Sequence, residues 1–143
     1  MQHEYNIALV VGAGLSSIAS LLHVGIIIGG APWYRFFGAG ERMAVAAAAG
    51  RTYPALVTAS IAAVLALWAA YALSGAGVIA ALPLLKPGLC AITLIYLLRG
   101  FAAVPVLALG QPRSVPFVVW SSVICTAFGT AHLIGLSQVW RTM

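Results

Sequence analysis

Apolar residues follow one another in long runs along this chain, interrupted by only seven basic and two acidic residues. A helix needs about 20 consecutive apolar residues to cross the roughly 30 Å hydrocarbon core of a bilayer. Three runs are clearly long enough, and they extend over about 6–30, 53–74 and 115–136. The pattern therefore predicts three transmembrane helices at these positions.

A fourth apolar stretch, from 77 to 109, is longer than one span and shorter than two. A helix over 78–98 places Lys86 near mid-membrane, whereas a helix over 88–109 places Arg99 near the centre. We predict a tilted helix over 84–108, with the Arg99 side chain extending toward its nearer interface. The four spans predict an all-α integral membrane protein, a four-transmembrane-helix bundle that forms one domain over 1–143.

The composition supports this class, because 63% of the residues are hydrophobic and only 6% are charged. About a quarter of the residues in soluble domains are charged. The net charge is +5, but the basic residues are scattered between the spans and do not line one face. This distribution favours anionic lipid over nucleic acid as the partner.

The basic residues are distributed unequally between the two ends of the predicted spans. An even number of spans places both termini on one side and the loops 31–52 and 109–114 on the other. These two loops contain Arg35, Arg42, Arg51 and Arg113. By the positive-inside rule the loops are cytoplasmic, and we expect both termini in the periplasm of a bacterial inner membrane.

Small residues recur at helical spacing within the first span. Gly25 and Gly29 form a "GIIIG" pattern, and Gly12, Ser16 and Ser20 lie four residues apart. Such spacing allows two helix backbones to approach closely in a membrane. We expect these faces to pack within the chain, while a homo-oligomer or a larger membrane complex stays open as the alternative.

The interfacial segment 31–52 gathers aromatic and charged residues between the first two spans. Four aromatic residues, Trp33, Tyr34, Phe36 and Phe37, surround Arg35. From about Ala39 the sequence predicts a short interfacial helix that carries Glu41 and Arg42.

Two interpretations of this segment compete. One is an aromatic belt with basic anchors at the level of the lipid headgroups, which needs no ligand. The other is a pocket for an anionic headgroup or ligand, lined by Trp33, Tyr34, Arg35, Arg42 and Arg51. We favour the belt as the simpler interpretation.

Arg99 is the most unusual residue, because an arginine within a span costs about 2.5 to 3.5 kcal/mol on insertion scales. No predicted span contains an aspartate or glutamate to pair with it. Either the side chain reaches the interface, or it lies in a polar cavity with Tyr96, water or an anionic ligand. Tyr96 and Arg99 therefore join the candidate ligand-binding residues.

Candidates for covalent chemistry are weak. The chain has no aspartate, which excludes a Ser/His/Asp triad, and only His23 and Glu41 are suited to acid–base catalysis. His23 and His132 differ in expected depth by roughly 15 Å, too far to hold one haem iron. Cys90 and Cys125 have no metal-type spacing, so we expect neither a metal nor a cofactor.

These observations favour a non-covalent role, as a lipid- or amphiphile-binding protein or as an accessory subunit of a membrane complex. One alternative is a membrane enzyme that acts on a lipid-soluble substrate with an anionic group, using His23 and Glu41. Another is an oligomeric transporter or channel subunit.

Overall fold

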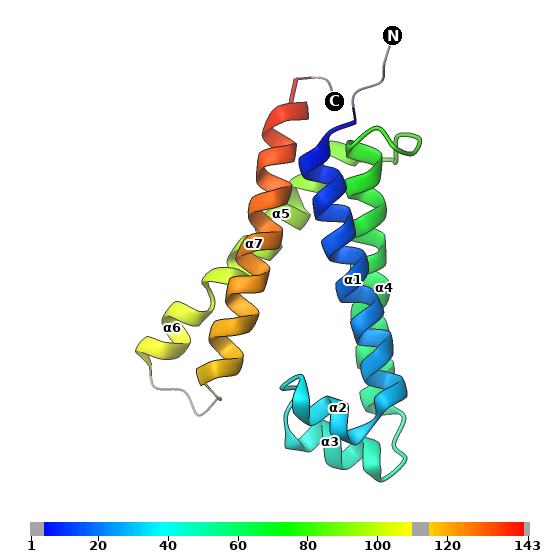
Figure 1. The fold of residues 1–143 in the computed structure, drawn as a ribbon, viewed down its shortest axis with the longest axis vertical. Helices are drawn as coiled ribbons and strands as arrows, with labels where there is room; N and C mark the ends of the chain where they lie inside the picture. The colour runs from blue at the N-terminus through cyan, green and yellow to red at the C-terminus, as the bar shows by residue number, and fades with distance from the viewer. Residues whose placement is uncertain (1–4, 110–114, 142–143) are drawn as a thin grey trace. The chain divides into compact units, whose positions relative to one another are not determined.

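Helices make up all the regular secondary structure in residues 5–109 and 115–141, the part of the chain that the computed structural model describes (Figure 1). They are α1 (Ile7–Gly29), α2 (Ala31–Phe36), α3 (Glu41–Ala48), α4 (Tyr53–Gly75), α5 (Leu85–Phe101), α6 (Ala103–Ala108) and α7 (Val115–Val139).

Four segments are long and apolar enough to cross a membrane: Ile7–Gly29, Tyr53–Gly75, Leu85–Val106 and Phe117–Val139. The all-α class and the expected number of four membrane-spanning segments are thus confirmed among the described residues. Four such helices fit an integral membrane protein. Of the predicted loop 109–114, residues 110–114, with Arg113, lie outside the described residues.

Two compact units divide the chain: residues 1–15 with 68–143, and residues 16–67. We call them the terminal unit and the inner unit. In the terminal unit, α5 crosses against α7 and α6 lies beside α7 (Figure 1).

Glycines let α5 and α7 approach closely. A Cβ atom on Gly129 of α7 would lie 2.7 Å from the Leu97 side chain of α5, and one on Gly100 of α5 would lie 2.9 Å from the Thr126 backbone nitrogen. Real Cβ atoms essentially never show contacts under 3.0 Å. Small residues therefore join these helices, as expected where lipid removes the hydrophobic drive for association.

Proline divides the third span, which we predicted as one continuous helix over 84–108. The structure has α5 ending at Phe101 and α6 beginning at Ala103. Pro105 lacks an amide hydrogen for the carbonyl of Phe101, and its ring crowds that carbonyl. The break therefore lies where the proline removes a helical hydrogen bond. Pro87 causes no break, because it lies in the first turn of α5, where amides need no helical partner.

In the inner unit, α2 and α3 lie side by side (Figure 1). We predicted one short helix in segment 31–52, and the structure has two, because Pro32 starts the additional helix α2. Ile26, Tyr34 and Ala44 form the buried core between α1, α2 and α3. The Tyr34 hydroxyl also lies 3.1 Å from Oγ1 of Thr58 on α4, which ties α2 to that helix.

The glycines of the "GIIIG" pattern contact a tryptophan. A Cβ atom on Gly29 would overlap the Trp33 indole, and one on Gly25 would lie 3.2 Å from its Cζ3. The pattern is thus used within the chain, but its partner is an aromatic side chain from the following helix. Ser20 on the same helix donates a hydrogen bond of 2.8 Å to the Ala62 carbonyl of α4.

Candidate functional site

Arg35 and Glu41 form a bidentate ion pair between α2 and α3. Nε of Arg35 donates to Oε2 of Glu41 at 2.9 Å, and Nη2 donates to Oε1 at 2.8 Å. The hydrogen bonds from Arg35 lower the pKa of the Glu41 carboxyl, and the same pairing raises the pKa of Arg35. The only carboxylate suggested for acid–base chemistry is therefore held ionised by its neighbour.

The other two arginines of this segment are exposed. Arg42 lies in the first turn of α3, and Arg51 follows the end of that helix. The large apolar residues that are exposed in the same segment and at its junction with α4 are Trp33, Phe36, Val45 and Tyr53. Because Glu41 neutralises Arg35, this surface combines the two exposed cations Arg42 and Arg51 with apolar side chains, which suits the headgroup level of a bilayer.

Tyr34 and His23 are committed to local structure. The Tyr34 side chain is buried in the α1–α2–α3 core, so it does not line the surface that carries Arg42 and Arg51. Nδ1 of His23 donates to the Ala19 carbonyl one turn earlier, at 2.7 Å.

Arg99 is exposed and interacts with a hydroxyl on α7. Its Nη2 donates to Oγ of Ser121 at 3.0 Å, and that hydroxyl lies 3.3 Å from the Val118 carbonyl. At 1.5 Å per residue, Arg99 lies roughly 10 Å from the Val106 end of its span, and Ser121 lies roughly 6 Å from the Phe117 end of its own. The guanidinium thus extends toward the nearer end of the spans.

Tyr96 does not accompany Arg99 on the exposed face of α5. It is 4% exposed, and its ring packs against the rings of Trp68, Phe128 and His132 at centroid distances of 4.9, 5.4 and 5.2 Å. This aromatic cluster joins α4, α5 and α7. The structure therefore places the two span-three candidates in different surroundings.

His132 is fully buried beside Tyr96. Its Nδ1 donates to the Phe128 carbonyl at 2.9 Å, and Nε2 has no hydrogen-bond partner among the described residues. A Cβ atom on Gly12 of α1 would lie 2.8 Å from the ring. The small residue at position 12, which we interpreted as part of a helix-packing row, thus makes room for this imidazole.

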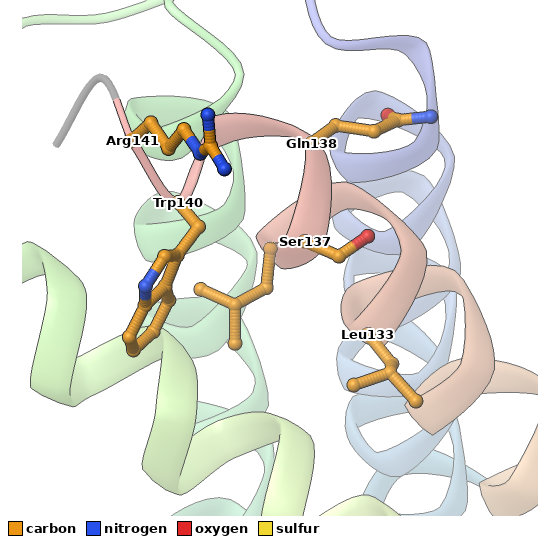
Figure 2. Close-up of a pocket in the computed structure, with 6 residues that line it drawn as sticks. Leu133, Ser137, Gln138, Trp140 and Arg141 are labelled. Atoms are coloured by element: carbon orange, nitrogen blue, oxygen red, sulfur yellow. The ribbon is translucent and has the colours of Figure 1, made fainter.

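A pocket of about 460 Å³ at the end of α7 was not predicted from the sequence. It is lined by Leu133, Leu136, Ser137, Gln138, Trp140 and Arg141 (Figure 2). Its residues are ordinary for a span end, and only the spacing of four between Leu133, Ser137 and Arg141 and between Leu136 and Trp140 marks these five as one face.

Comparison with known proteins gives no assignment, because no family model, curated protein or solved structure matches the chain. Within residues 5–109 and 115–141, no three histidine, cysteine, aspartate or glutamate side chains gather in a way that could hold a metal ion.

Proposed function

We propose that this protein binds anionic membrane lipid, with the guanidinium of Arg99 contacting the lipid phosphate. The observation that carries the proposal is the exposed position of Arg99 within an apolar span, where the hydrogen-bond partner among the described residues is the neutral hydroxyl of Ser121. An arginine there costs about 2.5 to 3.5 kcal/mol unless a partner compensates its charge.

The Ser121 hydroxyl accepts only one hydrogen bond from the Arg99 guanidinium and does not balance its charge. Arginine carries five N–H donors and a charge that persists at any physiological pH. A hydroxyl accepts one of those hydrogen bonds and supplies no opposite charge. A phosphate accepts two in parallel and is anionic, which makes it the better partner at the border of the hydrocarbon region.

The exposed surface of segment 31–52 supports the same function from a second place in the chain. Arg42 and Arg51 are exposed cations beside the exposed aromatic residues Trp33 and Tyr53. Basic residues near a membrane surface each contribute about 1 kcal/mol to the attraction of anionic lipid. The enzyme alternative has less support, because Glu41 is paired with Arg35.

Native mass spectrometry after gentle extraction tests the proposal by comparing the binding of phosphatidylglycerol and phosphatidylcholine. We expect the protein to prefer phosphatidylglycerol, and we expect Arg99→Gln to weaken that binding about fivefold, as the loss of roughly 1 kcal/mol predicts. Arg99→Lys keeps the charge and should retain most of the preference.

The double variant Arg35→Gln/Glu41→Gln is the matched control, because it removes an arginine without changing the net charge. It should leave the lipid preference intact. Equal binding of both lipids by the unmodified protein, or an unchanged preference in Arg99→Gln, would refute the proposal and favour the role of an accessory subunit, whose partner chains the same spectra report.

A further inference from the structure

The last turns of α7 present one continuous face to a pocket. Leu133, Ser137 and Arg141 lie four residues apart, and so do Leu136 and Trp140, so these residues of α7 and of the turn after it share one side. The pocket measures about 460 Å³, within the range of about 300 to 1,000 Å³ typical of small-molecule sites.

Two interactions fix the walls of this pocket. Nζ of Lys86, in the first turn of α5, donates to the Trp140 carbonyl at 3.0 Å and lies 4.1 Å from the centre of the Trp140 ring. On the other side, Nδ2 of Asn6 donates to Oε1 of Gln138 at 2.8 Å. The indole and the amide are therefore held in place by residues from other elements.

The pocket is apolar at one end and positively charged at the other, which matches the acyl chain and the anionic headgroup of a phospholipid. Leu133 lies at the opposite end of the pocket from Arg141 (Figure 2). At 1.5 Å per residue these two residues are roughly 12 Å apart along the helix axis. The apolar end lies within the span Phe117–Val139, and the cation lies beyond its end. The Ser137 hydroxyl donates to the Ile134 carbonyl, so it adds no free donor to the apolar part.

We propose that this pocket binds one phospholipid with an anionic headgroup. The phosphate contacts the exposed Arg141 guanidinium, while the upper part of one acyl chain lies along the exposed Leu133 side chain and the Trp140 ring. Lys86 adds a second positive charge beside the indole. This pocket is separate from the site at Arg99. Ser121, the hydrogen-bond partner of Arg99, lies roughly 30 Å from Arg141 along the α7 axis.

Fluorescence quenching of Trp140 in nanodiscs tests this proposal. Lipids brominated near the glycerol end of the acyl chain quench a nearby indole, and the difference between the unmodified protein and Trp140→Phe isolates the Trp140 signal. We expect brominated phosphatidylglycerol to quench Trp140 more strongly than brominated phosphatidylcholine at the same fraction of the bilayer. Arg141→Gln should lower the apparent affinity for phosphatidylglycerol about fivefold, and Arg141→Lys should retain it.

The control variant is Thr130→Val on the same helix. Thr130 is exposed and its hydroxyl bonds to the Thr126 carbonyl of its own helix, so the variant should leave the quenching of Trp140 unchanged.

Equal quenching by both phospholipids would show ordinary boundary lipid and overturn the proposal. Selective quenching by brominated palmitate, with none by phosphatidylglycerol, would overturn it too and assign the pocket to a free fatty acid. Trp140 reports only on this pocket, so its outcome is distinguishable from that of the Arg99 experiment.

Discussion

The Trp33 indole leaves little room for a side chain at two glycines of the first span. We predicted that Gly25 and Gly29 pack against a helix, because small residues four apart allow backbones to approach. In the structure the Trp33 indole fills this groove. The spacing predicts a groove on a helix, but it carries no information about which side chain enters it.

A methyl group at position 29 should displace this indole. Gly29→Ala places a Cβ atom within the Trp33 ring, so we expect a loss of stability of about 1 to 3 kcal/mol, as for other overpacked sites. Thermal unfolding in detergent measures the loss.

The control for this variant is Gly14→Ala. A Cβ atom on Gly14 would have no neighbouring heavy atom within 4 Å, so this change should preserve stability or raise it by about 0.5 to 1 kcal/mol. Equal effects of the two substitutions would contradict the contact between Gly29 and Trp33.

The Arg35–Glu41 pair predicts a pH dependence at the residue scale. The pKa of Glu41 is lowered in the folded protein, so the pair stabilises the fold above the unfolded carboxyl pKa of about 4.3. This stabilisation is lost as the pH falls through the lower, folded-state pKa.

Unfolding measurements from about pH 6 to pH 3 compare the native protein with Glu41→Gln. The difference in stability between the two should shrink as the pH falls, because protonation of Glu41 removes the ion pair. A difference that stays constant over this range would show that the pair does not contribute to stability.

At the scale of elements, the sequence predicted the first two spans to within about one residue, because their apolar runs end at glycine or at charged and aromatic residues. The fourth span, α7, continues beyond the expected end at 136 to Val139, and the Lys86 side chain bonds the carbonyl of the next residue, Trp140. That contact joins residues far apart in the chain, and no local pattern indicates it.

The break between α5 and α6 predicts opposite outcomes for two prolines. Pro105→Ala restores the amide that bonds the Phe101 carbonyl, so we expect α5 and α6 to join and amide hydrogen exchange at residues 102–104 to slow. Pro87→Ala changes a position in the first turn of α5 that needs no helical hydrogen bond. It should leave amide exchange at the junction of α5 and α6 unchanged. Unaltered exchange in Pro105→Ala would show that another contact causes the break.

For the whole molecule, the charges and the apolar pattern indicated a membrane protein. They did not indicate which of the candidate residues contact one another. Tyr96 and Arg99 are one turn apart in sequence, yet one joins a buried aromatic cluster and the other contacts Ser121 on α7. His132 and Gly12 lie in contact from distant parts of the chain. Such pairings depend on which helices are neighbours, which a single sequence does not specify.

Orientation in the membrane is a further prediction at this scale. The arginines of segment 31–52 place that segment in the cytoplasm by the positive-inside rule, so the carboxyl terminus should lie in the periplasm. A reporter fused after Met143 should be active only if it is one that functions in the periplasm. Activity of a cytoplasmic reporter at that position would reverse the orientation.

The most direct test of lipid binding is the distance between Arg99 and lipid phosphorus. Solid-state NMR of protein with ¹³C-labelled arginine in phosphatidylglycerol bilayers detects the coupling between the guanidinium carbon and ³¹P. A guanidinium that bonds phosphate with N–O distances of about 2.7 to 2.9 Å gives strong dephasing. The other arginines near lipid, among them Arg141, also contribute to the dephased signal. We predict that Arg99→Gln removes one part of this signal and leaves the rest, whereas identical dephasing in both proteins would contradict the proposed role of Arg99.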